Sequence, residues 1–316
     1  MSERVPVVLD VDTGTDDALA LAYAVESPRI DLVAVTTVAG NVDVEKTTAN
    51  TLSVLDWLGA RDVPVHRGAS RPLVRAHRDA IYFHDEGGLG GARLPSSTRS
   101  IEADRGPAAL IRLARQRPGE LTLVTLGPLT NLAIALNVEP ALPGLLKSVV
   151  VMGGAFTVPG NTTLAAEFNV LVDPEAAEQV FTAPFPNLTA VGLDVTERVA
   201  LTRDDWDAVN AADSFPLAAR LLREVGRFAF ARQGRVQLSL HDPLSVAVAT
   251  DPTLVELREV AIAVDAVEPD RGRTRITGPG TVRVATSVDA QRALDEFRRT
   301  VGLPTGRQGE VRIGVS

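Results

Sequence analysis

Short apolar runs alternate with longer helical segments over most of the 316 residues of this chain. The runs are apolar throughout, without alternating polar residues, which is typical of parallel strands covered on both faces. A repeated order of strand, helix and strand predicts an α/β fold with an open, mostly parallel sheet flanked by helices. The strands that we expect are Val5–Asp10, Asp31–Val38, Val63–Arg67, Leu121–Leu126, Ser148–Met152, Leu188–Leu193 and Val260–Val264.

Segments with helical character occupy the stretches between and after these strands. They are Asp16–Glu26, Val44–Leu58, Gly106–Gln116, Leu129–Asn137, Pro174–Thr182, Leu217–Arg227, Pro243–Ala249 and Asp289–Thr300. Near the C-terminus, Thr274–Thr277 and Thr281–Thr286 flank a Gly-Pro-Gly segment (278–280), which predicts a small β-hairpin. Residues 196–240 read as helices without an intervening strand, and we interpret them as a helical flap on a single domain of residues 1–316.

Composition excludes several classes of protein and of site. The chain has no Cys, which excludes a disulfide framework, a Cys-ligated zinc or iron–sulfur site and thiol catalysis. Its formal net charge of −8 argues against binding to nucleic acid or to an anionic membrane surface. The N-terminal apolar run is too short for a signal peptide, and no stretch is long enough to span a bilayer. We therefore expect a cytoplasmic protein.

Four carboxylates follow the first expected strand in the segment Asp10-Val-Asp12-Thr-Gly-Thr-Asp16-Asp17. Open α/β sheets bind their ligands at the carboxyl ends of strands, which is where this segment lies. Carboxylates this close repel one another unless a cation or a solvated turn separates them. Oxygen ligands without Cys favour Ca²⁺ or Mg²⁺ over zinc. Asp16 and Asp17 would also suit the N-terminus of a helix for electrostatic reasons alone.

Two known carboxylate motifs share features with this segment. An EF-hand is excluded, because counting from Asp10 the sixth residue is Thr15, not Gly, and the twelfth is Leu21, not Glu. A phosphatase of the haloacid-dehalogenase type also opens with strand-Asp-x-Asp and would use Asp10 as nucleophile with Mg²⁺. Its motif has Thr or Val where Gly14 stands, so it is kept as an alternative.

A second group of polar residues lies far along the chain, at His241-Asp242-Pro243. Pro243 suits a first helical turn and Asp242 an N-cap, which is the structural interpretation. The functional interpretation makes Asp242 a further carboxylate for the cation and His241 an acid or hydrogen-bond donor. Further polar groups lie in apolar surroundings at Asn41, the carbonyl of Leu126, Asn161, Glu167 and Asn169. They would suit sugar hydroxyls or a hard cation, and each could equally be a helix cap or a turn.

Seven segments, taken in order, carry a family resemblance. They are DVDTGTDDALAL, AGNVDVEKTTAN, HDEGGLGG, VTLGPLTNLA, VVMGGAF, AAEFNVLVDPEAA and HDPLSVA. Together they resemble the nucleoside hydrolases of the inosine–uridine-preferring type, over nearly the whole chain. The resemblance implies hydrolysis of a ribonucleoside to ribose and free base, a tightly held Ca²⁺ in an open α/β fold, and a homodimer or homotetramer.

The resemblance also implies a role for individual residues. Asp12 would be the general base that takes a proton from water, and His241 would donate to the leaving base. Asp10 matches a position with a supportive role. The Ca²⁺ ligands that it implies are Asp12, Asp17, the carbonyl of Leu126, and Asp242. The residues that it implies for the substrate are Asp16, Asn41, His84, Met152, Asn161, Glu167 and Asn169.

The nucleobase preference stays open at this point. Members of the family contact the base with aromatic residues before the motif His-Asp-Pro, but here that segment contains no Tyr. The side chains left open as base contacts are those of His84, Phe228, Arg232 and Gln233. The presence of His241 favours inosine, uridine or pyrimidine nucleosides as substrates. A non-catalytic nucleoside-binding protein is the second alternative, although such a protein has no need of a base and a donor.

Overall fold

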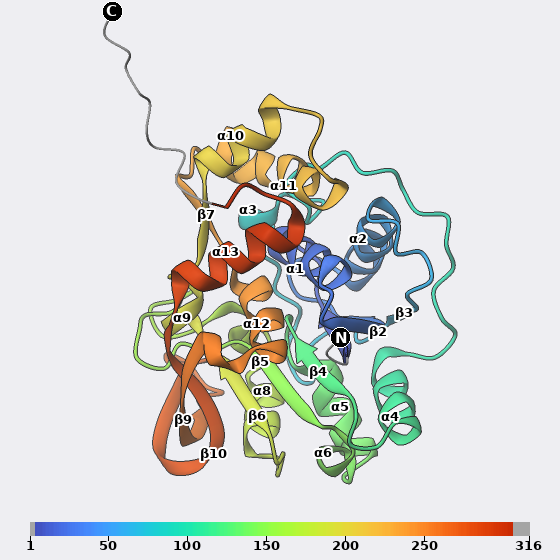
Figure 1. The fold of residues 1–316 in the computed structure, drawn as a ribbon. Helices are drawn as coiled ribbons and strands as arrows, with labels where there is room; N and C mark the ends of the chain where they lie inside the picture. The colour runs from blue at the N-terminus through green and yellow to red at the C-terminus, as the bar shows by residue number, and fades with distance from the viewer. Residues whose placement is uncertain (1–3, 306–316) are drawn as a thin grey trace, which may run out of the picture.

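The protein is described by a computed structural model that covers residues 4–305, so the ends of the predicted 1–316 domain lie outside it. Its centre is an eight-stranded sheet in the order β3-β2-β1-β4-β5-β6-β10-β9 (Figure 1). All neighbouring strands are parallel except β9 and β10, which confirms the predicted fold class. The strands are β1 (Val5–Val11), β2 (Ile30–Thr37), β3 (Val65–Arg67), β4 (Thr122–Thr125), β5 (Ser148–Met152), β6 (Leu188–Val191), β9 (Val255–Val264) and β10 (Thr274–Val288).

The strand order reverses next to β1, and this reversal positions the site. The chain runs from β1 outward to β2 and β3, and then returns to place β4 on the other side of β1. Asp10 pairs with Thr36 of β2 on one side and with Thr125 of β4 on the other. The loops that follow β1, β2 and β4 therefore diverge at one edge, where open α/β sheets form their ligand crevice.

Helices cover both faces of the parallel part of the sheet, which explains why the strands there are largely apolar, whereas β9 and β10 alternate with polar residues. Val7, Leu9 and Val11 pack with α1, α2, α11, α12 and α13, whereas Val8 packs with α4, α5 and α8 on the opposite face. Among residues 4–305, no helix is both long and apolar enough to cross a membrane. The helices are α1 (Thr15–Glu26), α2 (Val44–Trp57), α3 (Ile81–His84), α4 (Gly106–Gln116), α5 (Thr130–Val138), α6 (Leu142–Leu145), α7 (Phe168–Val172), α8 (Pro174–Thr182), α9 (Leu193–Thr196), α10 (Arg203–Ala211), α11 (Leu217–Arg227), α12 (His241–Thr250), α13 (Ala290–Val301), the π-helix η1 (Phe228–Arg232) and the 3₁₀-helix η2 (Pro252–Leu254).

The predicted flap contains two strands that the sequence prediction missed. Helices α10 and α11 form its outer part, at the top of Figure 1. Strands β7 (Ala200–Thr202) and β8 (Gln237–Ser239) pair antiparallel at its base. Each is three residues long and buries one apolar side chain, Leu201 or Leu238, so neither shows a readable alternation. The prediction of helices alone is wrong for these six residues.

A β-hairpin near the C-terminus is present, but its turn is not where the sequence predicted it. Strands β9 and β10 form the hairpin, which extends at the lower left of Figure 1, and residues 265–273 connect them. The Gly-Pro-Gly segment (278–280) lies inside β10, where the pairing register shifts. Pro279 has no N–H to donate to the ladder, and a Cβ on Gly280 would lie 2.4 Å from the backbone nitrogen of Ala261. The segment is therefore a bulge within one strand.

Candidate active site

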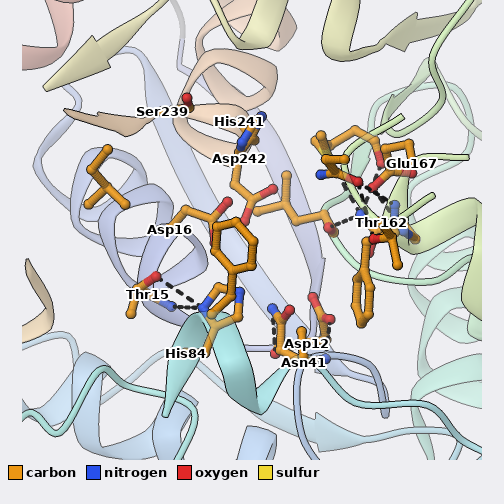
Figure 2. A pocket seen from close by; sticks show the side chains of 18 of the residues that line it. Asp12, Thr15, Asp16, Asn41, His84, Thr162, Glu167, Ser239, His241 and Asp242 are labelled. Atoms are coloured by element: carbon orange, nitrogen blue, oxygen red, sulfur yellow. Dashed lines mark hydrogen bonds between the residues drawn. The ribbon is translucent and has the colours of Figure 1, made fainter. Parts of the chain in front are cut away.

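A cavity of about 260 Å³ opens at the strand ends described above (Figure 2). Its walls come from the ends of β1, β2, β4 and β5, from α3 and the start of α7, and from the segment that leads from β8 into α12. The predicted site residues that line it are Asp12, Asp16, Asn41, His84, Leu126, Met152, Asn161, Glu167, Asn169, His241 and Asp242.

Asp12 lies directly after β1, and its side chain is only 1% exposed. Its Oδ2 accepts a hydrogen bond from the backbone N–H of Asn41 at 2.7 Å. A Cβ on Gly40 would lie 2.1 Å from Asp12 Oδ2, and one on Gly127 would lie 2.8 Å from Oδ1. Glycine at both positions leaves the space that this carboxylate occupies between the loops after β2 and β4.

Asp17 does not line the cavity but holds the start of α1 together behind it. Its Oδ1 accepts from the backbone N–H of Asp12 at 3.1 Å, and its Oδ2 accepts from that of Gly14 at 2.9 Å. The side-chain amide of Asn41 donates to the same Oδ2 at 3.3 Å. Asp17 therefore satisfies free N–H groups at the helix N-terminus and fixes the turn that carries Asp12.

Three carboxylates form a cluster that could hold a metal ion. Oxygens of Asp16, Asp17 and Asp242 all lie within 4.8 Å of one another, and Figure 2 shows Asp16 and Asp242 side by side. Burial, followed by repulsion from Asp17, raises the pKa of Asp16 to about 7. Burial and the neighbouring carboxylates also raise the pKa of Asp12 and Asp242 well above the usual range. Such a group needs protons or a cation, and its oxygen-only donor set suits Ca²⁺ or Mg²⁺.

Among its carboxylates, the cluster differs in one member from the predicted ligand set. Asp16, predicted to bind ribose, lies in the cluster, whereas Asp12 lies next to it and contributes to the raised pKa of Asp242. The carbonyl of Leu126, also a predicted ligand, accepts a hydrogen bond from Asn169 Nδ2 at 2.7 Å. The residues present therefore fit a hard divalent cation, with carboxylates from α1 and α12.

The opposite wall comes from the segment that enters α7. Glu167 accepts from the backbone N–H groups of Asn169 and Val170 and so begins the helix, and it also accepts from Gly154 N–H at 3.1 Å. Asn169 Nδ2 contacts the carbonyl and sulfur of Met152 at 3.3 and 3.4 Å. Both polar side chains are thus held in place by backbone contacts while they face the cavity.

Two histidines line the cavity, and both are neutral near pH 7. The backbone N–H of Thr15 donates to His84 Nδ1 at 3.1 Å, which leaves the ring proton on Nε2. Burial, Arg235 and His241 lower the pKa of His84 to about 3. His241 Nδ1 lies 2.8 Å from the Thr196 hydroxyl, and burial lowers its pKa to about 4.

Residues 7–295 match the family described as inosine-uridine preferring nucleoside hydrolase. The chain is a member of this family. It is 37% identical over 303 residues to the non-specific ribonucleoside hydrolase RihC of Escherichia coli, covering 91% of this chain and 95% of that protein. It is 34% identical over 311 residues to the probable uridine nucleosidase 2 of Arabidopsis thaliana, covering 92% and 95% of the two chains.

Solved structures of nucleoside hydrolases share the fold. A plant nucleoside hydrolase superposes with a TM-score of 0.87 at 32% identity, covering 94% of this chain and 99% of its own. A purine-preferring ribonucleoside hydrolase from Gardnerella vaginalis superposes with a TM-score of 0.86 at 33% identity, covering 94% and 98%. This nucleoside hydrolase is therefore an enzyme, a glycosidase that acts on the N-glycosidic bond of ribonucleosides.

Asp10, the nucleophile of the phosphatase alternative, lies behind the cavity of this nucleoside hydrolase. It is fully buried, and its Oδ1 accepts from Thr36 Oγ1 at 2.5 Å and from Asn131 Nδ2 at 2.7 Å. Burial raises its pKa to about 7. A buried carboxyl group that does not reach the cavity cannot attack a substrate there, so the position fits the supportive role that was predicted.

Three of the four side chains left open as base contacts do not line the cavity. Phe228, Arg232 and Gln233 belong to the π-helix η1 and the residue after it, and only His84 of the four lines the cavity. The Arg232 side chain is 62% exposed, with its Nη1 3.7 Å from a carboxylate oxygen of Asp85. The chain turns back to the cavity after η1, where residues 235 and 237–239 line it.

Several cavity residues were missed by the sequence analysis. Tyr82 and Phe83 precede His84 in α3, and an aromatic pair beside a predicted substrate residue was the available signal. Arg235 and Gln237 lie in a segment whose hydrophobic residues follow neither a helical nor a strand period, so no local sequence pattern identifies them. The further residues missed are Thr15, Ala80, Thr162, Phe168, Glu197, Leu238 and Ser239.

Proposed function

We propose that this nucleoside hydrolase is Ca²⁺-dependent, uses Asp12 as general base and His241 as donor to the leaving base, and prefers inosine and uridine or pyrimidine nucleosides. One arrangement carries the proposal. The buried Asp12 carboxylate shares a cavity with Asp16 and Asp242 of the carboxylate cluster and with His241. The geometry combines a base, a candidate cation site and a neutral donor within reach of one small substrate.

The proposed ligands of the cation are Asp12, Asp17, the carbonyl of Leu126 and Asp242. Asp16 lies in one cluster with Asp17 and Asp242. When bound, Ca²⁺ would orient the attacking water and lower its pKa. Asp12 then accepts the proton from that water. Positive charge develops on the ribose as its bond to the base breaks, and the buried carboxylates stabilise this charge better than they stabilise the ground state.

The leaving base requires a hydrogen-bond donor, and we assign this role to His241. When the Thr196 hydroxyl donates to Nδ1, the ring proton lies on Nε2, from which it is available to the cavity. Because His241 is neutral near pH 7, it donates a hydrogen bond to the departing base and not a proton. The base takes up its proton from solvent, and Asp12 releases to solvent the proton that it accepted from water. Asp16, Asn161, Glu167 and Asn169 would bind the ribose hydroxyls, Asn41 would lie between sugar and base, and Met152 beneath the ribose.

The test of the base assignment is the release of ribose from inosine, uridine, adenosine and cytidine. We expect Asp12→Asn to lower kcat about 10²- to 10⁴-fold, because the amide cannot accept the proton while it still accepts from Asn41 N–H. Asp43→Asn is a matched control, because Asp43 is a helix N-cap outside the cavity and Asn caps equally well. Wild-type kcat in Asp12→Asn would overturn the assignment.

A non-catalytic nucleoside-binding protein would behave differently in the same assay. The wild-type protein would bind a ribonucleoside in calorimetry but release no ribose from any of the four substrates. We also propose a homodimer or homotetramer in the cytoplasm. Sedimentation velocity of the full-length protein checks the first expectation, and fractionation of the source cells checks the second.

A further inference from the structure

The side chain of Arg235 lines the cavity, and no acidic side chain among residues 4–305 pairs with it. Among the described residues that line this cavity, it is the one Lys or Arg, and the lining includes several carboxylates. Its guanidinium carbon lies 3.8 Å from the centre of the Phe83 ring, a cation–π contact. Within residues 4–305 it forms no ion pair and no side-chain hydrogen bond. Its N–H donors are therefore free for a ligand.

The backbone holds Arg235 in a defined position. Its N–H donates to the carbonyl of Ala229 in the π-helix at 3.0 Å, and its carbonyl accepts from Arg203 Nη2 at 3.4 Å. Arg203 in turn lies over the rings of Trp206 and Phe230, at 5.8 and 5.7 Å. The strand β8 follows two residues later and pairs with β7. With its backbone fixed and its guanidinium held over the Phe83 ring, Arg235 loses less entropy when it binds a ligand.

Within residues 4–305, Arg235 contacts the partly exposed aromatic wall of the cavity and pairs with none of the clustered carboxylates. Asp12 and Asp242 are 1% and 3% exposed, and they form the floor. Tyr82 and Phe83 are 49% and 37% exposed, and Phe83 is the ring that Arg235 covers. With its ribose on the carboxylate floor, as proposed above, a nucleoside would direct its base toward this rim. The base edge farthest from the ribose carries the oxo or amino group that distinguishes uracil from cytosine and hypoxanthine from adenine.

We propose that Arg235 selects bases with an oxo group at that edge, so that inosine and uridine are preferred over adenosine and cytidine. A guanidinium has five N–H donors and no acceptor. It can donate to an exocyclic oxygen, whereas an exocyclic amino group presents its own N–H groups and repels it. This inference rests on the proposed function and adds a specificity-determining residue to it.

The experiment compares kcat/KM for inosine, uridine, adenosine and cytidine in the wild type, Arg235→Met and Arg232→Met. In the wild type we expect kcat/KM for inosine and uridine to be about tenfold or more above that for adenosine and cytidine, respectively. This ratio corresponds to one charge-assisted hydrogen bond. Arg235→Met should lose this advantage on inosine and uridine and change adenosine and cytidine less than about threefold. Arg232→Met should keep the wild-type ratios, because Arg232 lies outside the cavity.

Binding of free bases to the wild-type protein gives a second measurement that needs no variant and no turnover. By calorimetry, hypoxanthine should bind about tenfold tighter than adenine, and uracil about tenfold tighter than cytosine. Equal binding, or an equal loss of kcat/KM on all four nucleosides in Arg235→Met, would overturn the assignment. If the wild type hydrolyses none of the four, the proposed function fails, and equal binding of oxo and amino bases would still overturn the role of Arg235.

Discussion

Thr15 decides the protonation of His84, because a backbone N–H can only donate and this one donates to Nδ1. The ring is neutral, with its proton on Nε2, and burial together with Arg235 keeps the pKa at about 3. The motif that contains His84 was recognisable in the sequence, but its tautomer was not. Thr15 lies 69 residues away in the chain, so the hydrogen bond exists only in the folded protein.

This half-buried neutral histidine makes stability depend on pH. The unfolded chain protonates His84 below about pH 6.5 while the folded protein keeps it neutral, so stability is lost as pH falls below that value. His84→Asn keeps an acceptor near the Thr15 N–H but cannot titrate. Between pH 7.5 and 5, we expect the wild type to lose about 1 to 2 kcal/mol more unfolding free energy than this variant.

Urea unfolding at the two pH values measures this difference. Both proteins are held in EDTA, so that release of a bound cation at low pH does not enter the comparison. Identical pH dependence in the wild type and His84→Asn would show that the folded protein does not keep His84 neutral.

At the scale of single elements, Glu167 and Asp173 are the N-caps of two consecutive short helices, α7 and α8. These two helices connect the wall of the cavity to the core. Asp173 begins α8 and accepts from Ala176 N–H at 3.1 Å, from Leu73 N–H at 2.9 Å and from Thr130 Oγ1 at 2.6 Å. The polar cluster around Glu167 reads from the sequence as either caps or sugar ligands. The structure shows that Glu167 is a helix cap and also lines the cavity, whereas Asp173 is a cap alone.

Removing the Asp173 cap should affect stability without affecting substrate binding. Asp173→Ala leaves three donors without their partner, two of them distant in the chain, and we expect a loss of about 2 to 4 kcal/mol in unfolding free energy. Asp173→Asn keeps an acceptor at the cap and should lose less. Thermal unfolding measures the loss, and an unchanged KM for inosine checks that the cavity is intact. A large rise in KM would place Asp173 in the substrate site.

At the scale of the whole molecule, the fold assembles one carboxylate cluster from two segments that are far apart in the chain. Asp16 and Asp17 begin α1 next to the first strand, whereas Asp242 lies in the first turn of α12. Asp242 meets the other two only because α1 and α12 lie on the same face of the sheet. A cation held by this cluster binds the folded chain and not the unfolded one, so it should stabilise the fold.

Removal of the cation with EDTA should therefore lower Tm, and Ca²⁺ should restore it. The gain from Ca²⁺ should be larger at pH 8 than at pH 6, because a pKa of about 7 at Asp16 means that protons compete with the cation at the lower pH. Scanning calorimetry at both pH values measures the effect. Asp242→Asn should abolish most of the gain. A Tm that does not respond to Ca²⁺ in the wild type would exclude a calcium site in this cluster.

The sequence by itself determined the α/β class, the parallel strands and the carboxylates at the end of the first strand. These depend on local patterns, namely apolar runs covered on both faces and polar residues at strand ends. Only the tertiary structure decided that β10 is one bulged strand, that Asp16 joins Asp17 and Asp242, and that Arg235 faces the cavity. Each of these depends on contacts between segments distant in the chain, which no local pattern records.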